Sequence, residues 1–323
     1  AIEVALTLSS EGEFVRNHDG RLCYRGPENP RLMTFYSRNG LLPAVRGRIG
    51  KRQNRFLTCE RIRQLVEQRP GEVLLSALFS LLKQELHDAN GYTPEWRKLM
   101  RGFGDPKKRL KQQIHQAKNG DGEAGELLWQ TIMAEIFPVV RLLYLNLRLD
   151  EREKFDRNFS TMFFMHAAPQ PIINAEKLLA LMEAGIVSIV RLGETYQFNS
   201  DGPDGPFEFT YTDPQGGAHR AIYPYVVNAC GQPRSVASDT AELTRNLRQR
   251  GLIQIGESEE PPAYKTGSIV IDPRTHRVIP QTANGLPLYA VGAMTRGQMI
   301  DASMAQGLIR STAAVADDLL ALL

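Results

Sequence analysis

The stretch RLMTFYSRNG, residues 31–40, decides how the fold is interpreted. Its apolar and aromatic run predicts a buried strand over residues 31–37, which a polar turn with a glycine ends. Upstream, Ile2, Leu6 and Phe14 lie on one face of a predicted helix. The order of helix, strand and glycine turn is typical of the second half of a βαβ unit. We therefore expect an α/β fold that is Rossmann-like.

The first residues of the chain suggest that this βαβ unit is incomplete. Residues 1–8, AIEVALTL, already have the pattern of a helix interior, with no cap and no strand before them. A polar loop is expected from Asn17 to Pro30, between the helix and the strand. The first strand of the βαβ unit is thus expected to lie outside this sequence, which makes the fold N-terminally incomplete. The alternative, loss of an initiator Met or a trimmed terminus, stays open.

Helices alone are predicted over roughly one hundred residues in the middle of the chain. Thr58 is a candidate N-cap, and apolar residues follow it at helical spacing. Further helices are expected over residues 94–100 and 106–117 and within the apolar stretch 127–149. We interpret this region as an all-helical insertion.

Alternation between strands and helices returns after Pro169. Helices are expected over residues 175–183, 241–250 and 303–320, the second of them ended by Gly251. Strands are expected over residues 186–192, 195–199, 207–212, 218–222, 224–229 and 288–291, and a hairpin joins residues 268–272 to 278–280.

Composition excludes several classes of protein. Of 323 residues, 42% are hydrophobic and 23% are charged, and no apolar run is long enough for a membrane span. The net charge of +3, from 39 basic and 36 acidic residues, does not suggest a nucleic-acid binder. Three widely spaced cysteines favour a reducing, cytoplasmic environment over a disulfide framework. We therefore expect neither nucleic acid nor membrane as a partner.

Two segments resemble a known family. The run GAMTRGQMIDAS, residues 292–303, is similar to the G-P-x-T-R-G-x-x-x-E-x-T segment of the FAD-NAD(P)-binding protein family. Residues 36–43, YSRNGLLP, resemble the S-R-x-G-L-L-P segment of the same family. Its members are two-dinucleotide flavoprotein oxidoreductases, distantly similar to flavin-dependent N-hydroxylating monooxygenases. The resemblance covers both ends of the chain well and the helical middle weakly.

The resemblance implies the C-terminal portion of an FAD-dependent, NADPH-using oxidoreductase, with monooxygenation as a more distant analogy. It implies a small-molecule substrate and leaves a homo-oligomer open. The alternative is a degenerate flavoprotein relative without activity, which acts as a protein-interaction module through its helical insertion. The implied domains are the remainder of an NADPH-binding Rossmann domain (1–57), the helical insertion (58–160), return strands of the nucleotide-binding domain (161–222) and the C-terminal part of an FAD-binding domain (223–323).

Ser37 and Arg38 are the candidate residues for choosing the nicotinamide cofactor. They end the second strand of the predicted Rossmann unit, where an acidic residue would bond a ribose hydroxyl and an Arg accommodates the 2′-phosphate. The planar guanidinium suits phosphate oxygens, so NADPH is preferred over NADH. The alternative for Arg38 is a solvated turn residue. The basic stretch 38–63 has the same two interpretations, an anion-binding rim or a solvated loop.

The candidate FAD-binding residues follow two strands near the end of the chain. A glycine after a strand allows close approach of the backbone to a ligand. Many flavoproteins carry Asp after this glycine, and Ala293 stands there in this chain. Asp301 is interpreted either as a helix cap or as a ligand contact, and Cys230 as a buried small residue. The candidates are Gly231, Gly292, Ala293, Met294, Thr295, Arg296 and Gly297.

Other chemistry finds little support in the sequence. The match to G-x-G-x-x-G at residues 120–125 follows a predicted helix rather than a strand, so we interpret it as a loop between helices. No spacing of histidines or cysteines predicts a metal site, and no hydrolase triad is recognisable. His166 is either a core histidine or a residue that approaches the flavin. No catalytic residue is assigned.

Overall fold

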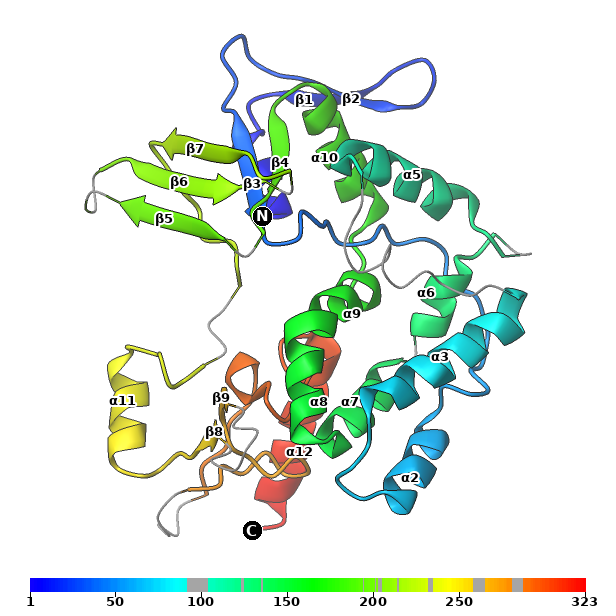
Figure 1. Ribbon diagram of the computed structural model, residues 1–323, viewed down its shortest axis with the longest axis vertical. Coiled ribbons are helices and arrows are strands. Elements are labelled where there is room, and N and C mark those ends of the chain that lie inside the picture. Colours follow the sequence, from blue (N-terminus) through cyan, green and yellow to red (C-terminus); the bar gives the residue numbers. More distant parts are fainter. Residues whose placement is uncertain are drawn as a thin grey trace. The chain divides into compact units, whose positions relative to one another are not determined.

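A computed structural model gives the fold (Figure 1). It describes residues 1–91, 104–122, 125–134, 136–193, 195–200, 202, 205–213, 215–231, 235–257, 265–280 and 287–323. The helix expected over residues 94–100 lies outside the described residues. Small sheets and many helices make a mixed α/β protein, which confirms the fold class at this level.

The chain divides into two compact units. Unit 1 comprises Ala1–Gln53, Leu86–Ala134 and Phe159–Ala229. Unit 2 comprises Asn54–Glu85, Glu135–Asn158 and Cys230–Leu323. Each unit therefore collects segments that are far apart in the sequence.

Unit 1 contains the expected helix and strand. Helix α1 spans Ile2–Leu8 and strand β3 spans Met33–Ser37. Strand β4, Val187–Arg191, pairs with β3 in parallel, so that the two strands end side by side. A parallel pair requires a long crossover, which the helices between residues 38 and 186 supply. The predicted helix at the beginning of the chain and the predicted strand at β3 are confirmed.

A hairpin replaces the expected loop between α1 and β3. Strands β1, Glu13–Arg16, and β2, Leu22–Arg25, pair antiparallel, so the expectations for Phe14 and for a loop from Asn17 to Pro30 were wrong. The Asn17 side chain closes the turn by accepting the N–H of Arg21 at 2.9 Å. Because Gly, Pro and Asn are frequent in this stretch, they indicated a loop and hid the short β-forming run of β2.

Helices contribute most of the buried core of unit 1. Helix α10 spans Ile172–Glu183 and helix α5 spans Pro106–Asn119, both near the expected bounds. Helix α6 spans Leu128–Met133. The core cluster contains fully buried side chains from α1, α5 and α10, among them Ala5, Leu110, Leu178 and Leu181. Burial of these apolar faces is the main term that stabilises the unit.

An antiparallel sheet completes unit 1. Strands β5, Tyr196–Ser200, β6, Phe207–Thr212, and β7, Ala218–Tyr223, pair in that order, as predicted (Figure 1). The buried strand expected over residues 224–229 was wrong. Within the described chain this segment pairs with no strand, and Tyr225 is 86% exposed. Its apolar residues predicted burial, but burial depends on a partner that the sequence does not show.

The first elements of unit 2 are helices, as predicted for the middle of the chain. Helix α2, Cys59–Gln68, starts at Thr58, whose hydroxyl accepts the N–H of Arg61 at 3.3 Å. Helix α3, Leu75–Asn90, follows and passes from unit 2 into unit 1. The others are α7 (Ile136–Asn146), α8 (Leu149–Lys154), the π-turn η1 (Phe155–Phe159) and α9 (Ser160–Ala167), the last of which lies in unit 1.

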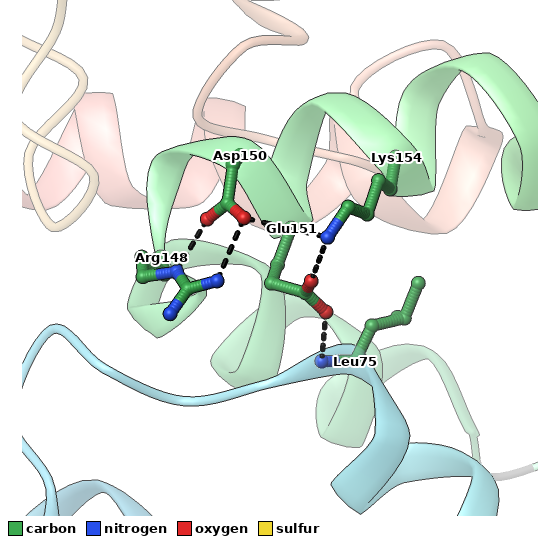
Figure 2. Close-up of polar contacts among 5 residues, drawn as sticks. All are labelled: Leu75, Arg148, Asp150, Glu151 and Lys154. Atoms are coloured by element: carbon green, nitrogen blue, oxygen red, sulfur yellow. Dashed lines mark hydrogen bonds and ion pairs between the residues drawn. The ribbon is translucent and has the colours of Figure 1, made fainter. Parts of the chain in front are cut away.

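Two buried carboxylates hold the helices of unit 2 in place. Glu151 accepts the N–H of Leu75 at 2.8 Å at the beginning of α3, and Lys154 donates to Glu151 at 2.5 Å (Figure 2). Arg148 binds Asp150 through two hydrogen bonds beside this contact (Figure 2). Glu85 is fully buried and accepts three backbone N–H groups, those of Arg55, Phe56 and Leu57.

The last third of the chain has less regular structure than expected. Its elements are α11 (Glu242–Gln249), β8 (Ile255–Glu257), β9 (Lys265–Ile269), the 3-10 turn η2 (Ala293–Thr295) and α12 (Ala305–Leu320). Gly251 follows α11 with φ 65°, as predicted for a helix end. Ile271 and Val278 form the expected hairpin contact. The buried strand expected over residues 288–291 was wrong: Tyr289 makes an isolated bridge to Arg277, and Val291 is exposed.

Among the helices that the structure describes, none has the length and apolar character needed to cross a membrane.

Candidate functional site

The first candidate site is the turn that follows β3. Ser37 lies opposite Arg191 in the parallel register, so the turn lies at the carboxyl ends of both strands. Gly40 has φ 61° and donates its N–H to the Ser37 hydroxyl at 3.0 Å. Leu192 donates its N–H to the Ser37 carbonyl at 2.9 Å, and Gly193 donates to the Arg38 carbonyl at 3.1 Å. These bonds hold the turn in one conformation.

Ser37 and Arg38 are both accessible in this turn. Arg38 is exposed and Ser37 is half-buried. Because the Ser37 oxygen accepts the Gly40 N–H, its own hydrogen can be donated to a ligand. The carboxyl ends of parallel strands are where open α/β sheets bind their ligands. The turn can therefore present a hydroxyl and a guanidinium to the same group.

Two further arginines adjoin the turn. Arg109 of α5 donates from Nη2 to the Gly40 carbonyl at 2.8 Å. Its Nη1 is buried and has no hydrogen-bond partner among the described residues. Burial lowers the pKa of Arg109, and the carboxylate of Asp105 partly offsets this. A Cβ at Gly40 would lie 3.1 Å from the Cβ of Arg191.

The set of groups suits a phosphate monoester. We call residues 37–40 the Ser37–Gly40 turn. One arginine lies in this turn, and further arginines reach it from β4 and α5. Guanidinium groups bind phosphate oxygens through paired charge-assisted hydrogen bonds. The Nη1 of Arg109 is a buried donor without a hydrogen-bond partner among the described residues, and it belongs to the same guanidinium that contacts Gly40. A buried donor without an acceptor costs stability, so it also suggests a ligand.

Of the four side chains at this site, the sequence predicted two. It identified Ser37 and Arg38 from their position after the strand. It missed Arg191, whose signal is its equivalent position at the end of the second parallel strand. It also missed Arg109, for which the sequence offers no signal, because the contact with Gly40 joins segments 69 residues apart.

The second candidate site is the segment from Gly292 to Gly297 in unit 2. Gly292 has φ 92° and precedes η2, which confirms its need for glycine. Thr295 is fully buried, and both its N–H and its hydroxyl bond the Gly292 carbonyl, at 3.0 and 2.9 Å. Ala293 and Met294 are half-buried. The accessible backbone of this segment is therefore that of Gly292, Ala293 and Met294.

Arg296 and Gly297 lie on the inner side of the same segment. Both are buried. A Cβ at Gly297 would overlap the hydroxyl oxygens of Ser268 and Thr266, so glycine is required by close packing on β9. Gly231 differs, because it is exposed, has φ 83° and leaves open space around the position that a Cβ would take.

Asp301 is an ion-pair residue rather than a helix cap. It is 2% exposed and pairs with Arg310 of α12. Helix α12 starts after Met304 without a side-chain cap, so the capping interpretation was wrong. The Oδ1 atom of Asp301 is buried without a partner in the described part of the chain.

His276 is a buried histidine that sequence reasoning placed in a hairpin turn. It is 2% exposed and has φ 60°, a backbone conformation that is uncommon outside glycine. Burial lowers its pKa, and Asp272 and Asp301 oppose that shift while Arg141 adds to it. His276 is therefore neutral near pH 7.

The remaining candidates are structural or exposed. His166 contacts Trp129 edge-on at 5.3 Å between ring centres, and burial lowers its pKa to about 4, as in a core histidine. Cys230 is exposed, so the expectation of burial was wrong. Gly120 is the C-cap of α5, which confirms that the G-x-G-x-x-G match follows a helix. The described residues contain no group of three potential metal ligands.

Comparison with known proteins gives one distant similarity. No family model matches the chain. A protein of Escherichia coli (strain K12) with the name Uncharacterized protein YdhS is 23% identical over 147 residues. The alignment covers 40% of this chain and 27% of YdhS, so the chain spans about a quarter of the length of this curated relative.

Proposed function

We propose that this chain is the NADPH-binding and flavin-facing portion of an FAD-dependent oxidoreductase. The observation that supports it best is the Ser37–Gly40 turn, with its hydroxyl, its exposed guanidinium and the contact from Arg109. A 2′-phosphate at the end of the second Rossmann strand requires such a group of donors. A free ribose hydroxyl would instead require an acidic residue there, and the turn contains none.

The architecture proposed for unit 1 is Rossmann-like. Helix α1 precedes β3, with the β1–β2 hairpin between them, and β3 pairs in parallel with β4. The proposal draws on this parallel pair and on the helices that connect its two strands. In that arrangement Arg38 and Arg109 bind the phosphate, and Ser37 orients it by donating its hydroxyl hydrogen. The site lies in the part of the molecule that the resemblance assigns to NADPH.

The Gly292 segment is proposed to face the flavin. Gly292, Ala293 and Met294 offer accessible backbone, and the first N–H groups of a 3-10 turn have no acceptor inside it. The bound flavin would accept a hydride from NADPH and pass electrons to oxygen or an organic acceptor. Thr295 fixes the turn that presents this backbone, through its two bonds to Gly292.

The wider proposals follow from the resemblance rather than from the site. They are a small-molecule substrate and monooxygenation as the reaction outcome. A cytoplasmic location is proposed from the three widely spaced cysteines instead. The alternative of a degenerate relative without activity draws on the sequence, in which the G-x-G-x-x-G match follows a helix. In that case the helical segments between residues 58 and 160 would bind a protein partner.

Calorimetric titration with 2′,5′-ADP tests the phosphate site, because this nucleotide carries the 2′-phosphate without the nicotinamide. We expect 2′,5′-ADP to bind at least about tenfold more tightly than 5′-ADP, since a charge-assisted hydrogen bond contributes about 1.5–3 kcal/mol. Arg38→Ala and Arg109→Ala should each remove most of that preference.

The matched control is Arg25→Ala, which removes an exposed arginine from β2 in the same unit. It should leave both affinities unchanged. Equal affinity for the two nucleotides, or a preference that survives Arg38→Ala, would show that the Ser37–Gly40 turn does not bind a 2′-phosphate.

A further inference from the structure

Strand β5 forms an open edge of the antiparallel sheet in unit 1. The sheet order is β5, β6, β7 (Figure 1). All five residues of β5 are exposed. Within the described residues, no strand pairs with its outer side. An edge strand presents unpaired backbone N–H and C=O groups, which are a template for another strand.

The sequence of β5 lacks the usual protection of an edge. Native edges carry charged residues, proline or a bulge. β5 is Tyr-Gln-Phe-Asn-Ser, with no charge and no proline, and it pairs with β6 over five residues in unbroken register. The opposite edge, β7, is different: Arg220 forms an ion pair with Glu208 at 2.8 Å, and His219 contacts Asp213 at 2.7 Å.

Aromatic side chains add an apolar surface to this edge. Side chains alternate between the two faces of a strand, so Tyr196 and Phe198 share one face and Gln197 and Asn199 the other. Tyr196 is 49% exposed and Phe198 is 45% exposed. The ring of Phe198 also stacks on the ring of Phe207, with 5.7 Å between the ring centroids. This contact fixes the Phe198 ring on the face of the sheet that carries the aromatic side chains.

We propose that β5 pairs with β5 of a second copy of this chain, antiparallel and centred on Phe198. In that register Gln197 lies opposite Asn199 of the other copy, and their amides can hydrogen-bond. Tyr196 lies opposite Ser200, and the two Phe198 rings meet across the two-fold axis. The strand is thus complementary to itself, as an isologous interface requires, and no like charges oppose each other.

The result is one antiparallel sheet of six strands shared by two copies. The contact is small compared with a standard protein interface, so the dimer is a weak one. The proposal does not rest on the cofactor sites, because β5 contributes no residue to either of them.

Sedimentation of the full chain over a range of concentrations measures the association. The unchanged chain should shift from monomer to dimer as its concentration rises. Phe198→Lys places two ammonium groups at the two-fold axis and should raise the dissociation constant by at least about tenfold. The control Ile222→Lys adds the same charge at an exposed position of β7 and should leave it unchanged.

A charge-swap pair tests the register. Gln197→Lys with Asn199→Glu places Lys opposite Glu twice in the antiparallel dimer and should preserve association. Gln197→Lys with Asn199→Lys places Lys opposite Lys and should abolish it. Parallel pairing would instead put like charges together in both variants.

Far-UV circular dichroism confirms that each variant is folded. A chain that stays monomeric at all concentrations overturns the proposal. A Lys/Lys variant that still dimerises, or a Lys/Glu variant that fails to associate, would also overturn it. The same holds if Ile222→Lys weakens association as much as Phe198→Lys does.

Discussion

Single buried residues carry much of the specificity of this fold. Glu85 has no exposed surface, and its carboxylate bonds three successive backbone N–H groups. Removing a buried acceptor leaves each donor unsatisfied, which costs more than the bond itself contributes. The carboxylate thus fixes the conformation of the backbone just before α2.

Glu85→Ala is expected to lower the free energy of unfolding by about 2–4 kcal/mol, because three backbone donors, one of them the buried N–H of Leu57, lose their buried acceptor. Glu85→Gln retains one carbonyl oxygen and should cost less. Urea denaturation followed by circular dichroism measures both. Glu60→Ala, at an exposed position of α2, is the control and should change stability little. Equal stability of Glu85→Ala and Glu60→Ala would show that the carboxylate is not needed.

Contacts between elements depend on ionised carboxylates, most clearly where α8 meets α3. Hydrogen bonds from Arg148 hold the pKa of Asp150 well below its usual range. Burial opposes the ionisation of Glu151, but Lys154 and the N–H of Leu75 hold its pKa below the ordinary value. A carboxylate with a lowered folded-state pKa stabilises the protein above the unfolded pKa, and this stability is lost as the pH falls.

Stability is therefore expected to be constant near pH 7 and to fall as the pH drops below about 4, the pKa of an unfolded carboxyl group. The urea midpoint at a series of pH values measures it. Asp150→Asn should lower the midpoint at pH 7 and reduce its pH dependence, while Asp19→Asn, at an exposed position, should leave the curve unchanged. An Asp150→Asn curve parallel to that of the unchanged chain would contradict this account.

Elements with strong local patterns could be predicted from the sequence, and contacts between distant segments could not. Helix α5 and strand β6 have clear periodicity, and their predicted bounds agree with the structure. The segment 224–229 has the composition of a buried strand, but composition does not supply a partner strand. Arg109 joins the Ser37–Gly40 turn only because α5 packs beside it, which no local pattern indicates.

The whole molecule consists of two units that are each assembled from three segments. Each unit has its own hydrophobic cluster, one around Leu178 and one around Ile271. Units with separate cores can unfold in separate transitions. The helical residues that the sequence groups into one insertion are divided between them.

Calorimetric unfolding should therefore resolve two transitions. Leu178→Ala should lower the melting temperature of one of them, and Ile271→Ala should lower that of the other, because each creates a cavity in one core. Leu319→Ala, at an exposed position of α12, is the control. A single transition that shifts equally in both core variants would contradict the division into two units.

We propose that this chain belongs to an NADPH-using flavoprotein. The most direct measurement is the visible spectrum of the natural gene product that contains this chain, recorded before and after anaerobic addition of NADPH or NADH. We predict flavin absorption bands that NADPH bleaches faster than NADH. A colourless protein, or a bound flavin that neither nucleotide reduces, would contradict the account.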